Sequence, residues 1–187
     1  TATNVLTSGK VTLKTTGAAA DILVDSITAA GNVVTLQAGN SIREVTPGDV
    51  SADVTATSVS LTAANGDIDL YLATSAATAV ASTAGKSVTL KNDAALALGA
   101  SSATTMTLNV GGVVSQTAAL TAGTLVINAF NGSDITLGQA NQVGTFAASS
   151  VSGATRGNIL INDTSGDLAL GTATNGITAN QLKITAV

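Results

Sequence analysis

A short apolar triplet recurs along this chain, and its spacing limits the fold more than any other feature. Each triplet has aliphatic residues at its ends and a small or polar residue between them, as in Val11-Thr12-Leu13 and Val88-Thr89-Leu90. One series of last members recurs at steps of 20, 18, 19 and 19: Leu70, Leu90, Leu108, Ile127 and Phe146. A second series runs out of phase with similar steps, except that its last step spans about two periods: Leu61, Val80, Leu98 and Leu137. A nearly constant period of this size is typical of repeat proteins that stack one supersecondary unit on the next.

The triplets have the pattern of short strands rather than helices. Their apolar residues alternate with small ones and include many β-branched side chains, and the three-and-four spacing of an amphipathic helix is missing. Because side chains alternate across a strand, both ends of a triplet face the core and its middle residue faces solvent. Turn-forming residues introduce many of the triplets: Gly9-Lys10, Gly31-Asn32, Asn65-Gly66-Asp67, Gly85-Lys86-Ser87, Asn131-Gly132-Ser133-Asp134, Gly157-Asn158 and Ser165-Gly166-Asp167.

We therefore predict an all-β fold, a right-handed parallel β-helix (β-solenoid) of about ten coils of about 19 residues, with residues 1–187 as one segment. At about 4.8 Å between paired strands, the rod would be about 45 to 50 Å long. An antiparallel sandwich would fit the strand spacing, but it calls for longer strands and a more aromatic core than the 2% of aromatic residues supplies. No amphipathic helix covers either end coil, so we interpret the segment as part of a longer repeat protein.

The composition removes most catalytic chemistry. The chain has no Cys and no His, so thiolate nucleophiles, histidine bases and the usual zinc sites are missing. Charged residues make up 10% of the chain, and the seven Lys and Arg are scattered singly. We expect no nucleic-acid partner, because no basic stripe is present to neutralise phosphates. No apolar run approaches the length of a transmembrane helix, so we expect no membrane insertion.

Carboxylates are the remaining catalytic resource, and Asp67 with Asp69 is the pair that a strand start would bring together. Polysaccharide-cleaving sites also need cations and aromatic platforms, and the neighbourhood offers only Tyr71. Calcium could bind the Asp-containing turns, but the nonapeptide period of calcium-binding solenoids is missing. Outward Thr residues could order ice, but Thr-x-Thr pairs do not follow the period. We therefore expect no catalytic, cofactor-binding or metal-ligating residues, and no cofactor.

Two stretches lose the repeat pattern, and we expect both to protrude as loops. The first runs from Ile42 to Val54 and contains Arg43, Glu44 and the only proline, Pro47. The second runs from about Ala140 to Arg156. Charged loops of this kind are usually solvated turns, and an interaction site is the alternative.

Three strings in the last third resemble the degenerate repeats of filamentous-haemagglutinin-like adhesins of the two-partner-secretion type: residues 157–162 (GNILIN), 165–170 (SGDLAL) and 175–182 (NGITANQL). The resemblance implies a secreted, non-catalytic protein of the bacterial cell surface, a structural and adhesive shaft exported through an outer-membrane transporter. It also implies a host or neighbouring-cell ligand of unknown identity. The alternatives are a self-assembling extracellular filament, sheath or matrix protein, associating end to end or side by side, and a carbohydrate-binding or polysaccharide-degrading β-helix.

Overall fold

The computed structural model describes residues 1–74 and 79–186, which form nineteen strands and no helix. The strands are β1 (Val5–Leu6), β2 (Val11–Lys14), β3 (Ile22–Val24), β4 (Ile27–Ala38), β5 (Ile42–Glu44), β6 (Val54–Ala63), β7 (Ile68–Thr74), β8 (Ala79–Ala84), β9 (Ser87–Asn92), β10 (Leu96–Leu98), β11 (Ser101–Val110), β12 (Val114–Gln116), β13 (Leu120–Ala129), β14 (Ile135–Ser152), β15 (Thr155–Arg156), β16 (Ile159–Asp163), β17 (Ala169–Leu170), β18 (Ile177–Thr178) and β19 (Leu182–Ala186).

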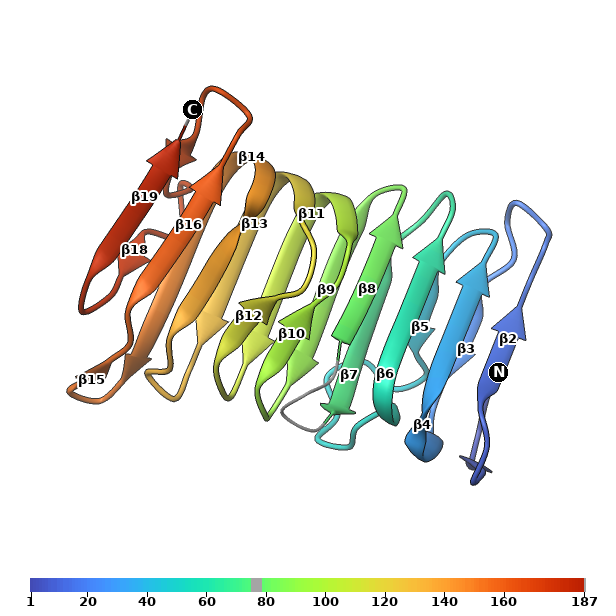
Figure 1. The fold of residues 1–187 in the computed structure, drawn as a ribbon. Helices are drawn as coiled ribbons and strands as arrows, with labels where there is room; N and C mark the ends of the chain where they lie inside the picture. The colour runs from blue at the N-terminus through green and yellow to red at the C-terminus, as the bar shows by residue number, and fades with distance from the viewer. Residues whose placement is uncertain (75–78, 187) are drawn as a thin grey trace.

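The strands stack in parallel, each coil pairing with the coil before and after it, so the predicted parallel β-solenoid is confirmed (Figure 1). Eight successive pairings carry the chain from Lys14 in the first coil to the last coil at Ala186. The solenoid therefore has about eight turns, and the expectation of about ten was too high, because several turns are longer than the period predicted from the sequence. Turns in the middle of the chain keep close to that period, whereas the turn that takes Ile27 to Val54 is about half as long again.

The predicted pairing of apolar residues between successive coils is correct at some positions and wrong at others. Leu70, Leu90, Leu108 and Ile127 face one another in successive coils as expected. The next coil is longer, so Ile127 faces Ala148, and Phe146 faces Leu125. Phe146 was predicted to be the partner of Ile127 because this coil is two residues longer than the coil before it and still alternates apolar and small residues. Similarly, Val80 faces Val59 and not Leu61.

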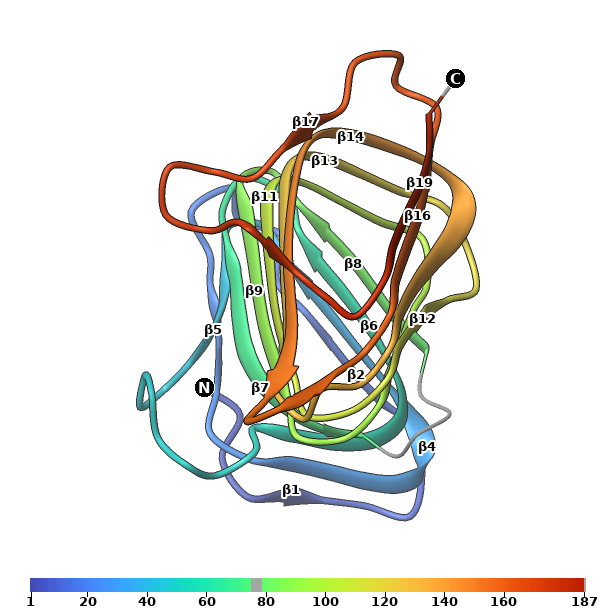
Figure 2. The same cartoon turned by 90° about the vertical axis from the view of Figure 1, so that its left-hand side faces the viewer.

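Figure 2 looks nearly along the stack of coils. Aliphatic side chains from the inner faces of the strands fill the interior of this stack. Leu36, Leu61, Leu90 and Leu108 are each at most 1% exposed. Burying such a side chain stabilises the fold by about 1.5 to 3 kcal/mol, before the cost of ordering the chain. Phe146 lies fully within this core, whereas Phe130 is exposed at a turn.

Asn and Asp side chains tie the turns of neighbouring coils together. The Asn65 amide donates to the Gly39 carbonyl at 2.8 Å, and the Asn131 amide donates to the Gly111 carbonyl. Asp134 accepts a hydrogen bond from the backbone N–H of Asn158 at 2.7 Å. These contacts satisfy backbone groups at the corners, where the strand ladder is interrupted.

The two expected loops have different outcomes. The Ala140–Arg156 expectation was wrong, because most of this stretch belongs to β14, whose end forms a short antiparallel hairpin with β15. The strand pattern of this stretch is hard to recognise in the sequence because Asn141, a polar residue, is fully buried on the inner face. Its amide donates to the carbonyl groups of Gln139 and Asn162, and its side-chain oxygen accepts from the Leu120 N–H, so the buried position is satisfied.

The Ile42–Val54 stretch begins as β5 and then leaves the solenoid wall. Residues 45–52 form a protruding loop, which we call the 45–52 loop, and Val54 returns to the ladder as the first residue of β6. The expectation of a loop is therefore correct for the middle of this stretch, and its two ends are strands.

Replacing Leu108 with Ala should lower the free energy of unfolding by about 2 to 5 kcal/mol, because it leaves a cavity between two coils. The matched control is Thr107→Ala on the outer face of the same strand, which should change stability by no more than about 0.5 kcal/mol. Chemical denaturation followed by far-UV circular dichroism measures both. Equal effects at the two positions would contradict the assigned inner and outer faces.

Candidate functional site

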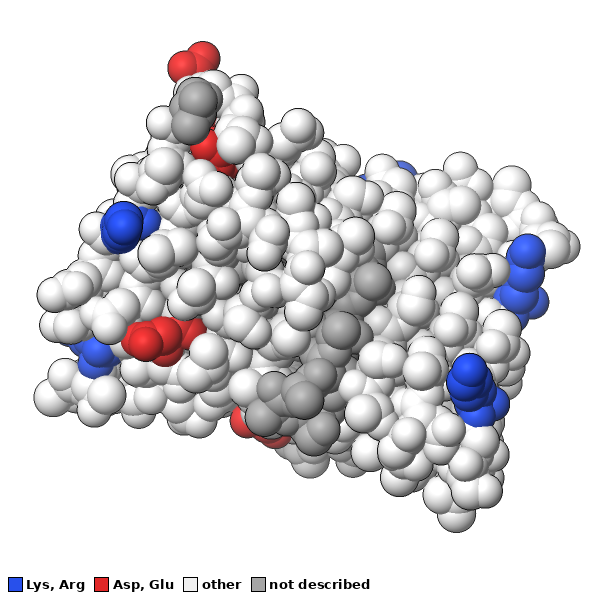
Figure 3. All heavy atoms as spheres, viewed as in Figure 1, with Lys and Arg blue, Asp and Glu red and all other residues white. Residues whose placement is uncertain are grey.

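Charge gathers in one part of the solenoid. Residues 43–93 contain six of the eleven acidic side chains and three of the seven basic ones, so they carry −3 of the chain's net charge of −4. By contrast, the face seen in Figure 3 is mostly free of charged side chains. The charged region is therefore the part of the surface most distinct from the rest.

Parallel register brings the outer residues of β5, β7 and β9 into one row. Arg43 faces Asp69, which in turn faces Thr89 in the next coil. The 45–52 loop adds Pro47 as a wall, and the result is a surface hollow of about 480 Å³. The following residues line it: Arg43, Pro47, Asp67, Ile68, Asp69, Ser87 and Thr89.

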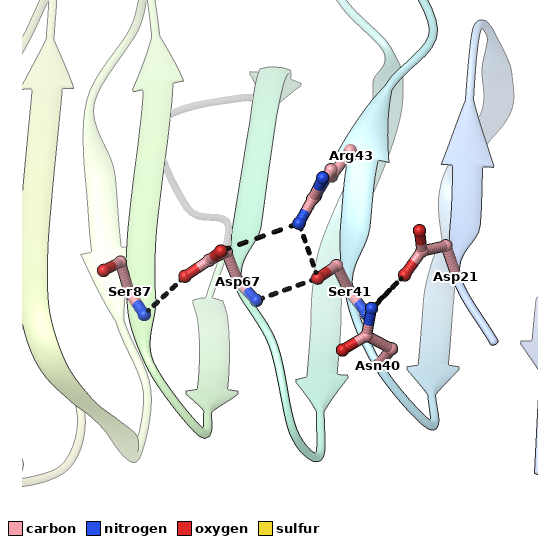
Figure 4. Close-up of polar contacts among 6 residues, drawn as sticks. All are labelled: Asp21, Asn40, Ser41, Arg43, Asp67 and Ser87. Carbon is pink, nitrogen blue, oxygen red and sulfur yellow. Dashed lines mark hydrogen bonds and ion pairs between the residues drawn. The ribbon is translucent and has the colours of Figure 1, made fainter. Parts of the chain in front are cut away.

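Asp67 is engaged in contacts that hold coils together (Figure 4). Its Oδ1 accepts a hydrogen bond from the Ser87 N–H at 3.1 Å, and its Oδ2 lies 3.7 Å from the Arg43 guanidinium. Ser41 Oγ accepts hydrogen bonds from both Arg43 and the Asp67 N–H. In the coil before Ser41, Asp21 accepts a hydrogen bond from the Ser41 N–H at 3.0 Å, just as Asp67 accepts one from the Ser87 N–H. Asp67 is thus one of a series of carboxylates that receive an N–H from the next coil.

Asp69 behaves differently, although it is only two residues away. Among the residues that the structure describes, none forms a hydrogen bond or an ion pair with its side chain. Partial burial raises the pKa of the Asp69 carboxyl, the nearby Asp67 raises it further, and Arg43 opposes the shift. The sequence pair Asp67 and Asp69 therefore consists of one carboxylate fixed in the architecture and one that faces the hollow.

Asp53 is a buried carboxyl beside this hollow, and the sequence analysis did not select it. It is 2% exposed, and its Oδ2 accepts a hydrogen bond from the Tyr71 N–H at 2.7 Å. Burial raises the pKa of Asp53 to about 7 against the effect of that hydrogen bond, and the negative charges of Glu44, Asp49 and Asp69 add to the rise. No sequence motif marks Asp53, because its burial follows from the fold alone, in which the chain rejoins the solenoid wall at this residue.

Tyr71 offers no open aromatic platform for a sugar ring. The residue is 7% exposed, and the Lys91 ammonium lies 3.7 Å from the centre of its ring. Its hydroxyl forms a hydrogen bond with Asp93, which is the main reason that the pKa of Tyr71 rises to about 12. The ring is therefore occupied by contacts within the protein.

The other candidate chemistries receive little geometric support. In the described ranges, no group of three or more acidic side chains is placed to hold a metal ion. Thr105 pairs with Ser87 and Thr107 with Thr89 in the preceding coil, but in the following coil Thr107 pairs with Val126. The paired hydroxyl rows are therefore broken, as the irregular sequence spacing indicated.

The comparisons with known proteins identify one similarity. Residues 85–150, which run from the turn before β9 into β14, match a family model described as "Repeats of unknown function (DUF5649)". No curated protein and no solved structure matches the chain. Within the described residues, no helix has the length and apolar character needed to cross a membrane.

Substituting Ala for Asp67 and for Asp69 should have different effects on stability. Asp67→Ala should cost about 1 to 2 kcal/mol, because it leaves the Ser87 N–H without its acceptor and Arg43 without its ion pair. Asp69→Ala should leave stability unchanged within about 0.5 kcal/mol or raise it, because burial already disfavours its charged form. Urea denaturation at neutral pH measures both. A larger loss for Asp69→Ala than for Asp67→Ala would contradict these roles.

Proposed function

We propose that this chain is a structural and adhesive shaft segment of a large secreted bacterial surface fibre and that it is not an enzyme. The observation that supports the proposal best is the unbroken parallel pairing from the first coil to the last. Such a stack grows by adding coils, so its length can be set by the number of repeats. The match of residues 85–150 to a repeat family agrees with growth of this kind.

The proposal includes the right-handed winding expected from the sequence. Parallel strands joined by crossovers wind right-handed in nearly all known cases, because strands twist that way. It also includes export through an outer-membrane transporter and a ligand on a host or neighbouring cell, both of which follow from the resemblance to filamentous-haemagglutinin-like adhesins. The face seen in Figure 3 carries few charged side chains, which suits a shaft whose solubility depends on hydroxyl and amide groups.

Two rival functions share this fold. In a self-assembling filament, sheath or matrix protein, the coils of one copy would continue into the next. In a carbohydrate-active β-helix, the hollow beside β7 would bind sugar. The second is less favoured, because Asp67 is engaged in the architecture and Tyr71 is covered by Lys91.

A shaft built from interchangeable coils should tolerate the loss of one whole coil. Removing residues 102–120 joins Ser101 to Thr121, which faces Ser102 in the intact chain, so every later strand keeps its register. This variant should remain folded with a β-type circular dichroism spectrum. The control removes residues 102–110 alone, which deletes most of β11 without closing a coil and should unfold the chain. Equal loss of structure in both variants would overturn the modular shaft.

Electron microscopy and assays of binding separate the rivals. Short rods of uniform length support the shaft, whereas long unbranched filaments from the purified chain would establish self-assembly instead. Beads coated with the chain should adhere to target cells, and a reducing-sugar assay on common polysaccharides should show no turnover. Measurable turnover that is lost in Asp69→Asn would replace the proposal with a carbohydrate-active enzyme.

A further inference from the structure

We infer that the 45–52 loop is a pH-dependent strap beside the hollow, closed while the Asp53 carboxyl is protonated and loosened when that carboxyl ionises. The loop is attached to the solenoid wall at both ends, the Asp53 residue at its far end is buried, and its Pro47 forms one wall of the hollow.

The loop is attached at its two ends and held mainly by itself in between. At its start, the Val45 N–H donates to the Val24 carbonyl at 2.8 Å. Its middle is closed by local bonds, from the Gly48 N–H to Glu44 and from the Ser51 N–H to Asp49. Val50, near the end of the loop, is 88% exposed, so apolar packing contributes little there.

The far end of the loop depends on Asp53. Its N–H donates to the Tyr71 carbonyl at 2.8 Å, and its carboxyl accepts from the Tyr71 N–H at 2.7 Å. This pair of bonds ties the end of the loop to β7 in the next coil. Because the carboxyl is almost fully buried, it can ionise with full solvation only if the end of the loop moves away from the wall.

Three carboxylates act on Asp53 and raise its pKa: Glu44 on β5, Asp49 in the loop and Asp69 on β7. Ile27 donates its N–H to the Asp53 carbonyl at 2.7 Å, and its strand β4 has no charged residues. Two cations act on these neighbours, since Lys91 lowers the pKa of Glu44 and Arg43 lowers the pKa of Asp69. An ionised Asp53 would therefore add a buried negative charge to a group of carboxylates, which is strongly unfavourable.

Low pH favours the closed loop. The pKa of Asp53 is about 7 in the closed state and about 3.9 when the carboxyl is solvated. The closed state binds the proton more tightly, so its advantage is complete below about pH 4 and declines as the pH rises to about 7. Above that pH the loop is held least firmly, and the Pro47 wall of the hollow can move away from Asp67 and Asp69.

The absence of Cys allows a single spin label to report on the loop. A nitroxide on Val50→Cys should be less mobile at pH 4 than at pH 8, because loosening of the loop adds backbone motion to that of the exposed side chain. The change should fall between about pH 4 and pH 7, the interval over which the closed state loses its advantage. In the Asp53→Asn background the mobility of the label should not change with pH, because the buried amide cannot ionise.

Two controls identify the source of any change. A label on Val113→Cys, in a different turn, should show no transition, and Asp134→Asn should leave the Val50 transition intact. Identical Val50 spectra at pH 4 and pH 8 would overturn the inference, as would a transition that persists in Asp53→Asn. If Asp53→Asn fails to fold, Glu44→Gln serves in its place. That variant should move the midpoint to lower pH by removing a neighbouring charge, and an unchanged midpoint would also contradict the strap.

Discussion

The parallel coil-to-coil register is the constraint on which the rest of this structure depends. It stacks Leu70, Leu90 and Leu108 above one another, and it also gives each strand's N–H and C=O groups their partners in the neighbouring coils. Burial and backbone hydrogen bonding are thus satisfied by one geometric condition. A shift of one residue would turn the aliphatic side chains to solvent and move the hydroxyls inward, so the register is strongly specified wherever the interior is aliphatic.

Polar side chains reinforce this register where the ladder breaks. Asn65 and Asn131 donate to carbonyls of the preceding coil, while Asp67 and Asp134 receive N–H groups from the following coil. Such contacts explain how a chain with 10% charged residues and no disulfides holds its corners. They also leave fewer carboxylates free for chemistry. Asp53 also receives an N–H from the following coil, but burial and three neighbouring carboxylates raise the pKa of its carboxyl to about 7.

The sequence was sufficient to predict the fold class and the register of the central coils. A fixed period and repeated triplets are local signals, and they survive wherever successive coils keep nearly the same length. The number of turns was overestimated because insertions such as the 45–52 loop lengthen a coil without leaving a strand signal. The buried Asn141 made part of β14 look like a loop, since its hydrogen bonds come from other coils. The role of Asp53 could not be predicted for the same reason, because its burial depends on Tyr71 in the next turn.

Distances between spin labels along one row of outer residues test the stacked-coil account most directly. The row runs through Lys14, Gln37, Thr62, Thr83, Ser102, Thr121 and Gln142, one residue for each coil. Cys substitutions that pair Gln142 with Lys14, Gln37 or Thr62 place six, five or four coil spacings between the labels. Double electron–electron resonance should give backbone separations of about 29, 24 and 19 Å, which fall by about 4.8 Å for each coil. Separations that fail to shorten by one strand spacing per coil would contradict the solenoid.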